Sequence, residues 1–285
     1  MNGARRTWLW TGMFLLLIPG LGCARASPAL GDEGTNAMTA EVAADLTVAR
    51  RGRIVFSHHS VGANILSGIE QLDSAAGGPR MRFASLEEAG GLEGPLLAHG
   101  RGGRNGDPKS KIDFFAALVR NGRRLRPDLA FMKLCYVDFN PRTDVDDLFS
   151  YYRRTLQALK AEHPEIQFAH VTVPLFRRPS DVKSSLRRIL GREVWEDAAN
   201  VKRGEYNRRL IETFASDPVF DLARAEATGP DGEATSFEYE RGRYPSMHAR
   251  YTDDGGHLNP LGQRVVGVAA IRFLADALRH RRDVR

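Results

Sequence analysis

A serine and an Asp-His pair stand at opposite ends of this chain, in settings that suit nucleophilic catalysis. Ser60 follows the apolar run 54–57 and opens a helical pattern, so it should lie where unpaired N–H groups favour negative charge. Asp254 precedes His257 by three residues, across two glycines. This spacing lets a carboxylate fix the imidazole tautomer while the other ring nitrogen faces a serine. The alternative is that Ser60 only caps its helix and that Asp253 and Asp254 belong to a polar turn.

These residues need a scaffold, and the chain predicts one in which strands alternate with helices. Strands are predicted over 54–57, 81–84, 129–137, 166–173 and 219–222, and helices over 61–72, 112–119, 145–159, 206–214 and 260–278, with Asn259 as the last N-cap and a glycine-rich loop through Gly106. Such alternation implies parallel pairing and a three-layer α/β/α domain. The segments after the strands, including 58–62 and 136–140, should then meet at one rim.

Two segments resemble blocks of the SGNH/GDSL hydrolases. His58-His59-Ser60-Val61-Gly62 resembles the first block, usually Gly-Asp-Ser followed by a glycine, with His-His in place of Gly-Asp. Asp254-Gly255-Gly256-His257 resembles the closing block before the last helix. The resemblance covers about residues 52–280 in block order and suggests a divergent branch of the family. It implies a flavodoxin-like parallel sheet, no cofactor, and a serine esterase that forms an acyl-enzyme on Ser60.

The resemblance is weaker in the middle of the chain, where the family supplies its oxyanion donors. Asn105-Gly106-Asp107 resembles the glycine block, which makes the Gly106 N–H a candidate donor beside that of Ser60. The position of the family's asparagine is held by Val137, which cannot donate a hydrogen bond. Asn105, Asn140 or Asn64 would have to replace it, because one missing donor costs roughly 10² to 10³ in rate.

Three polar residues near these blocks are candidate substrate contacts: His59, Asp138 and Asn140. Asp138 matches the last residue of the asparagine block, and we also expect it to organise its loop by hydrogen bonds. No metal site is expected, because adjacent residues such as His58 and His59 point to opposite faces of a strand.

The N-terminus predicts export. Arg5 and Arg6 precede an apolar run from Trp8 to Ile18, which is typical of a signal peptide over residues 1–22 and too short to span a bilayer. Gly20-Leu21-Gly22-Cys23 resembles a bacterial lipobox, although its leucine is one position closer to the cysteine than usual. We therefore expect a cell-envelope lipoprotein lipidated on Cys23, with an ordinary secreted or periplasmic protein as the alternative. Residues 23–50 are predicted to be a flexible tether and 51–285 the hydrolase-like domain.

Composition limits the partners. The formal charge of +6 falls to +4 once residues 1–22, with two arginines and no acid, are removed. The arginines come in scattered doublets rather than among aromatics, so nucleic acid is not expected. The only other cysteine, Cys135, lies in an apolar run and should be a buried thiol.

The expected substrate is an ester of a carbohydrate, such as an O-acetyl group, or an ester of a lipid; the oligomeric state is open. The alternatives are a polysaccharide O-acetyltransferase with the same triad and a non-catalytic envelope binding protein on a degenerate hydrolase scaffold.

Overall fold

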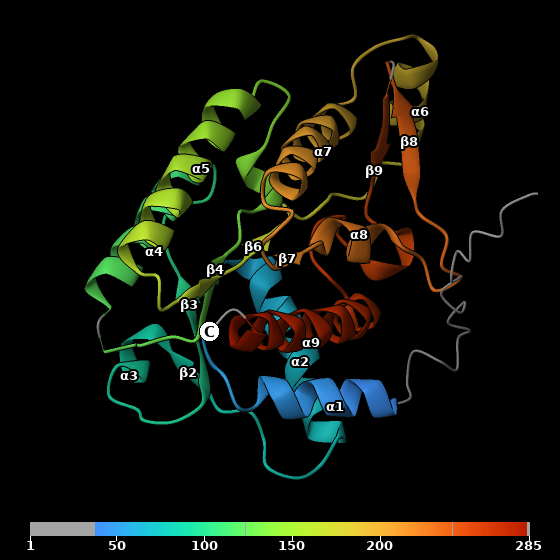
Figure 1. Cartoon of the computed structure of the whole chain (residues 1–285). Coiled ribbons are helices and arrows are strands. Elements are labelled where there is room, and N and C mark those ends of the chain that lie inside the picture. The colour runs from blue at the N-terminus through green and yellow to red at the C-terminus, as the bar shows by residue number, and fades with distance from the viewer. Residues whose placement is uncertain (1–37, 123, 241, 284–285) are drawn as a thin grey trace, which may run out of the picture.

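The computed structural model describes residues 38–122, 124–240 and 242–283, and its centre is a parallel five-stranded sheet (Figure 1). The strand order is β2-β3-β1-β4-β5, with every neighbouring pair parallel. The strands are β1 (Arg53–His58), β2 (Phe83–Ser85), β3 (Leu96–Arg101), β4 (Leu129–Met132) and β5 (Gln167–Phe168).

Two short strands extend this sheet beyond β5. β6 (His170–Val171) continues the path of β5 and pairs in parallel with β7 (Val219–Phe220). Between β5 and β6, Ala169 donates its N–H to the carbonyl of Ala130, so the strand is interrupted rather than ended. If β5 and β6 are taken as one strand, the order β3-β1-β4-β5/β6-β7 is the doubly wound order of flavodoxin, with β2 added at one edge.

Helices cover both faces of the sheet. On one face lie α1 (Ala40–Ala49), α2 (Ser60–Ala75), α8 (Leu222–Ala227) and α9 (Pro260–Asp283); on the other lie α4 (Pro108–Asn121), α5 (Val145–Glu162) and α7 (Trp195–Thr213). Alternate residues of β1 serve the two cores: Ile54 and Phe56 pack under α2 and α9, whereas Val55 packs under α4 and α5. The three-layer α/β/α architecture predicted from the sequence is confirmed.

The start of the domain corrects the sequence prediction. The segment predicted to be tether contains α1, capped by Thr39, whose side chain accepts the Val42 N–H. Val42 and Leu46 are buried in the core beneath α9, and Asp45 pairs with Arg279 of α9 at 2.7 Å. Because burial of an apolar helix face ties it to the domain, the folded unit includes Ala40–Ala49 and does not begin at residue 51.

Two strands also differ from their predictions. β3 lies inside the segment predicted to be a glycine-rich loop; its apolar part, Leu96 to Ala98, is too short to stand out beside the neighbouring glycines. β4 ends at Met132 instead of residue 137, and the chain continues through a buried extended segment into a 3₁₀ helix, η1 (Tyr136–Asp138).

A cap of extra elements stands at the upper right of Figure 1. It contains α6 (Val182–Ile189) and the antiparallel pair β8 (Ser236–Tyr239) and β9 (Gly242–Pro245). The remaining short elements are α3 (Leu86–Ala89) and η2 (Ala249–Tyr251). Within the described ranges, no helix is both long enough and apolar enough to cross a membrane. The predicted signal peptide and Cys23 lie outside those ranges.

Candidate active site

Ser60, His257 and Asp254 form a continuous chain of hydrogen bonds. The Nε2 atom of His257 lies 2.9 Å from Ser60 Oγ, and its Nδ1 lies 2.6 Å from Asp254 Oδ2. An Nδ1–H that donates to the carboxylate leaves the Nε2 lone pair for the serine hydroxyl. Ser60 and His257, which are 197 residues apart in the sequence, are thus within proton-transfer reach of each other.

The second oxygen of Asp254 fixes the carboxylate in place. Its Oδ1 accepts the N–H groups of Gly256 and His257 at 2.9 and 2.8 Å. Partial burial raises the pKa of Asp254, but these N–H groups and the imidazole outweigh burial and hold the pKa well below its ordinary value. The carboxylate is therefore ionised at any pH at which the protein would work. The neighbouring Asp253 instead accepts a hydrogen bond from Asn259.

Ser60 is the first residue of α2 and does not cap it. The N-cap is His59, and the Ser60 hydroxyl is engaged by His257, so the simple capping alternative does not hold. In the described part of the chain, no hydrogen bond is formed by the N–H groups of Ser60, Val61 or Gly62, as is usual for a first helical turn. These amides and the helix dipole favour negative charge beside Ser60.

The crossing of α2 and α9 brings the two halves of the site together. Both helices start at the site and meet at Gly68 and Gly267, where any Cβ would collide with backbone atoms of the other helix. Asn64 adds a link by accepting the Leu258 N–H at 3.2 Å. Asn64, one of the asparagines considered for the oxyanion hole, therefore uses its side-chain oxygen to join the helix of the serine to the loop of the histidine.

The loop that carries Asp254 needs both of its glycines. Gly255 has φ +95°, a conformation that side chains disfavour, and a Cβ there would lie 2.7 Å from the Phe176 ring. A Cβ on Gly256 would lie 2.5 Å from the Tyr136 ring. Tyr136 also meets the His257 ring edge-on, with centroids 5.7 Å apart, so it helps to hold the imidazole against the serine.

The glycine block does not supply the predicted oxyanion donor. The Gly106 N–H donates to Asp138 Oδ1 at 2.9 Å, so it is directed at the protein interior rather than at a substrate. Asn105 is exposed, and its Oδ1 accepts from Lys111 Nζ at 3.0 Å, which leaves the Nδ2 amide as a donor. Val137, at the position of the family's asparagine, is 44% exposed.

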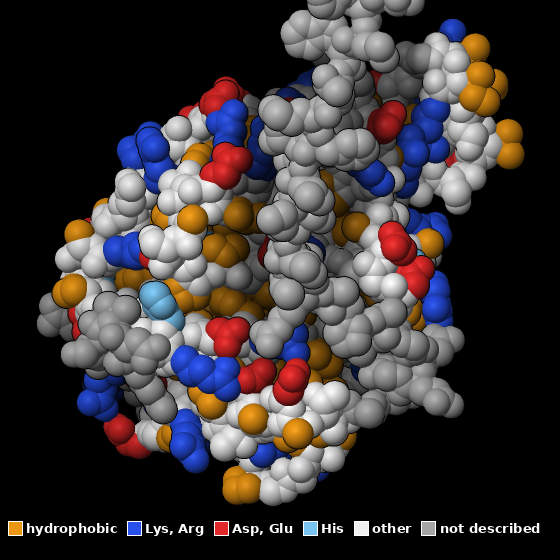
Figure 2. Space-filling model, turned by 45° about the vertical axis from the view of Figure 1, so that its right-hand side comes forward, with side chains coloured by type: hydrophobic (Ala, Val, Ile, Leu, Met, Phe, Trp, Pro, Cys, Tyr) orange, Lys and Arg blue, Asp and Glu red, His pale blue; other side chains and the backbone are white. Residues whose placement is uncertain are grey.

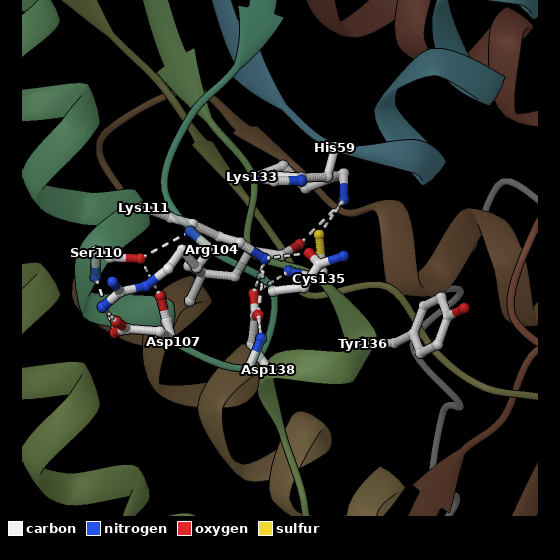
Figure 3. A network of polar contacts seen from close by, with 12 residues as sticks. His59, Arg104, Asp107, Ser110, Lys111, Lys133, Cys135, Tyr136 and Asp138 are labelled. Atoms are coloured by element: carbon white, nitrogen blue, oxygen red, sulfur yellow. Dashed lines mark hydrogen bonds and ion pairs between the residues drawn. The ribbon is translucent and has the colours of Figure 1, made fainter.

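A buried ion pair explains why Gly106 is engaged (Figure 3). Both oxygens of Asp138 lie 2.7 Å from Lys111 Nζ, and both side chains are buried. Asp138 Oδ2 also accepts the Cys135 N–H at 2.7 Å. The prediction that Asp138 organises its loop agrees with these contacts, whereas its predicted contact with substrate is wrong, because no part of the carboxylate is accessible.

Of the two histidines before the serine, only His58 contacts His99 of β3. His58 Nδ1 lies 2.7 Å from the carbonyl of His59, and His58 Nε2 lies 3.2 Å from His99 Nδ1. His59 directs its Nε2 to the Gly102 carbonyl at 2.9 Å. Burial lowers the pKa of His58 to about 4, despite the opposing hydrogen bond to the His59 carbonyl. The two adjacent histidines thus diverge, and His59 links the serine segment to the loop after β3.

Asn140 lies in a surface turn, with its side-chain oxygen accepting the Arg142 N–H; its contact with substrate stays a prediction. Lys111, Tyr136 and His99 also line or support the site, and none of them was predicted as a site residue. Lys111 alone left a signal: it shares the buried stripe of α4 with Phe115 and Val119, at helical spacing, and a lysine on an apolar stripe requires a buried partner.

No protein-family model matches the sequence, and no curated protein matches it. Among solved structures, a protein provisionally described as a platelet activating factor from Streptococcus pneumonia shares 12% identity and a TM-score of 0.42, over 81% of this chain and 91% of that one. An acetyl xylan esterase, AlAXEase, shares 16% identity and a TM-score of 0.40, over 79% and 96% of the two chains. A possible lipase from Chitinophaga pinensis shares 16% identity and a TM-score of 0.33 over the same shares. Similarities this low carry no argument about the reaction, which has to rest on the site itself.

Proposed function

We propose that this protein is a serine hydrolase that cleaves esters through an acyl-enzyme on Ser60. The observation that supports it is the chain of contacts from Ser60 Oγ to His257 and on to Asp254, at 2.9 and 2.6 Å. Each distance lies within the range in which a base activates a nucleophile and a third group orients the base. A polar turn without catalytic function has no need of an imidazole aimed at a helix-terminal hydroxyl.

In the proposed reaction, His257 Nε2 takes the Ser60 proton as Oγ attacks the ester carbonyl. The carbonyl oxygen then carries the negative charge, which the N–H of Ser60 and the first turn of α2 stabilise. His257 returns the proton to the departing alcohol, the C–O bond breaks, and the acyl group stays on Ser60. Water, deprotonated by the same imidazole, releases the acid and restores the serine.

We further propose that Asn105 takes the place of the family's missing asparagine. Lys111 holds the carboxamide by its oxygen at 3.0 Å, so the free Nδ2 has a defined direction and costs little to orient when the charge develops. Replacing Asn105 with alanine should lower kcat by roughly 10², whereas Asn121→Ala, at the exposed far end of α4, should leave it unchanged. Equal activity of the Asn105→Ala variant and the wild type would remove Asn105 from the oxyanion hole.

The open setting of the site supports a small acyl group on a large alcohol. The side chains of Asp254 and His257 are 57% and 40% exposed, so a bulky leaving group can approach the imidazole. Beside Asp254 and Gly255 lies a small cleft with Phe176 and Arg177 in its wall. This arrangement therefore suits an O-acetyl ester of a carbohydrate polymer better than a small ester that has to be enclosed by the protein.

Labelling with a fluorophosphonate tests the nucleophile. We expect the probe to modify Ser60, as located by mass spectrometry, and we expect Ser60→Ala and His257→Ala to lose roughly 10⁴ to 10⁶ in hydrolysis of p-nitrophenyl acetate without a change in melting temperature. Ser67→Ala is the matched control, since Ser67 lies on the same helix without contact to the triad. If Ser60 is not labelled, or if the Ser60→Ala variant is active, Ser60 is not the nucleophile and the proposed mechanism is wrong. Acetyl found on an added oligosaccharide instead of in free acetate would assign acyl transfer.

We also propose that the enzyme works in the cell envelope, tethered by lipid on Cys23. The basic pair at Arg5 and Arg6, the apolar run after it and the cysteine at the end of that segment support this location. In a high-salt buffer, which screens the attraction of surface cations to anionic lipid, Cys23→Ala should move the protein from the membrane fraction to the soluble fraction. If the variant and the wild type fractionate alike, Cys23 is not the anchor.

A further inference from the structure

α6 exposes an apolar face that no part of the described chain covers. None of its residues is buried. Val182 and Ile189 are 85% and 81% exposed, and Leu186 and Leu190 are 54% and 56% exposed. Their spacing of four, seven and eight residues from Val182 puts all four on one side of the helix. Water-exposed aliphatic side chains in a continuous stripe are uncommon on a soluble surface and mark an interaction site.

Cations flank this stripe, and acids are missing from it. Residues 182–192 include Lys183, Arg187, Arg188 and Arg192 and no Asp or Glu. Figure 2 shows hydrophobic side chains beside Lys and Arg side chains at this corner, at its upper right. Two of the arginines fasten the helix to the domain: Arg188 binds Asp197 through two nitrogens, and Arg187 donates to the Glu193 carbonyl. Lys183 and Arg192 form no ion pair within the described residues.

We propose that α6 docks the protein on an anionic lipid bilayer. A short helix with an aliphatic stripe between cations has the chemistry of an interfacial helix, whose apolar side enters the acyl boundary while lysine and arginine meet the headgroups. A second copy of this chain is less suitable, because eight helical residues offer far less than the ~800 Å² per partner of a stable dimer. The helix also protrudes instead of forming a groove, so it suits a soft, deformable surface.

Docking through α6 would bring the candidate active site near the membrane. The segment between β6 and α6 passes the triad, since the Arg177 N–H donates to the Gly255 carbonyl at 2.7 Å. Phe176 and Asp181, which begins α6 as its N-cap, lie on the same cleft as Asp254. The inference about α6 nevertheless does not rest on the hydrolase activity and can be tested in a Ser60→Ala protein.

The test uses the full chain with a polarity-sensitive fluorophore on α6. Val182→Cys in a Cys23→Ser background provides a unique reactive thiol, because Cys135 is buried. Gln157→Cys, on the exposed side of α5, is the matched control. On addition of phosphatidylcholine vesicles containing phosphatidylglycerol, the probe at 182 should shift to the blue and be quenched by brominated lipid, and the probe at 157 should not. Both labelled proteins have the same N-terminus, so membrane binding through that segment cannot explain a response that occurs only at position 182.

Two further variants separate the cations from the apolar face. The double variant Lys183→Ala and Arg192→Ala should lower the affinity for the anionic vesicles, measured with the probe at 182, by about 25-fold at low salt. This figure combines roughly fivefold for each cation. Leu186→Ser should abolish the blue shift while leaving the circular dichroism and the melting temperature almost unchanged, since no residue of α6 belongs to the buried core and Leu186 is half-exposed. The proposal is wrong if the two probes respond alike, if pure phosphatidylcholine works as well, or if position 182 is already shielded without vesicles. A dimer that requires Leu186 would also overturn it.

Discussion

Replacing Gly68 with alanine would test whether the contact between α2 and α9 sets the distance from Ser60 to His257. A Cβ at position 68 would lie 2.0 Å from the Gln263 carbonyl oxygen, whereas ordinary contacts begin at 3.4 Å. The obstacle is backbone, so no side-chain rotation relieves it, and the helices have to separate by roughly the difference, about 1.4 Å.

The geometry predicts where this displacement goes. Gly68 lies about 12 Å along α2 from Ser60, and a helix of this length moves nearly as a rigid rod. The 2.9 Å separation between Ser60 Oγ and His257 Nε2 would then grow to about 4 Å, beyond hydrogen-bond range. A misplacement of about 1 Å typically lowers kcat by roughly 100-fold. The overpacked contact should also cost about 1–3 kcal/mol of unfolding free energy, or about 2–12 °C in melting temperature.

The assay is steady-state hydrolysis of p-nitrophenyl acetate well below both melting temperatures, so that the loss of kcat is not a loss of folded protein. Gly91→Ala is the control, because a Cβ there meets its nearest neighbour, the Glu88 carbonyl, at an ordinary 3.6 Å. A Gly68→Ala protein that melts lower but keeps the wild-type kcat would show that the crossing stabilises the fold without positioning the triad. Unchanged melting and unchanged kcat together would refute the tight crossing itself.

Three further outcomes follow from the site and its surroundings. Asp254→Asn should lower kcat by about 10⁴ with little change in melting, because the exposed amide cannot hold the same imidazole tautomer. Burial lowers the pKa of His58 to about 4, so the folded state binds fewer protons than the unfolded state between about pH 4 and 6.5 and loses stability on acidification, by roughly 1 kcal/mol per pH unit. His58→Gln should remove that loss in urea titrations; an unaltered slope would contradict the assignment. Burial raises the pKa of Glu226 to about 8, so stability contributed by the neutral carboxyl falls as pH rises from about 4.5 to 8. Glu226→Gln keeps an oxygen for the Leu175 N–H and should melt higher than the wild type by a margin that grows with pH.

The sequence predicted the scaffold from its pattern of apolar residues, and that pattern also placed Ser60. Burial on both faces makes a strand such as 54–57 a continuous apolar run, and helices with one apolar side recur every few residues. Ser60 directly follows such a strand, so the alternation placed it at the rim where parallel strands end, whereas the Asp254-His257 pair was predicted from its resemblance to the closing SGNH/GDSL block before the last helix. Helix α1 was missed because most of its apolar residues are alanines that continue the small-residue composition of the preceding stretch, and its helical state depends on packing against α9.

The charge-stabilising part of the site was not predictable, because it depends on contacts between residues far apart in the chain. Local sequence placed a glycine N–H at position 106, but could not show that Asp138, 32 residues later, accepts it. The same carboxylate is neutralised by Lys111 in the interior, and removal of either partner would leave a buried charge that costs several kcal/mol. The hydrogen bond between the Gly106 N–H and Asp138 is therefore part of this buried network, and the Gly106 N–H is not available to a substrate. Under the proposed mechanism, stabilisation of the oxyanion would therefore come from the first turn of α2 and from Asn105, whose side-chain oxygen is held by that same lysine.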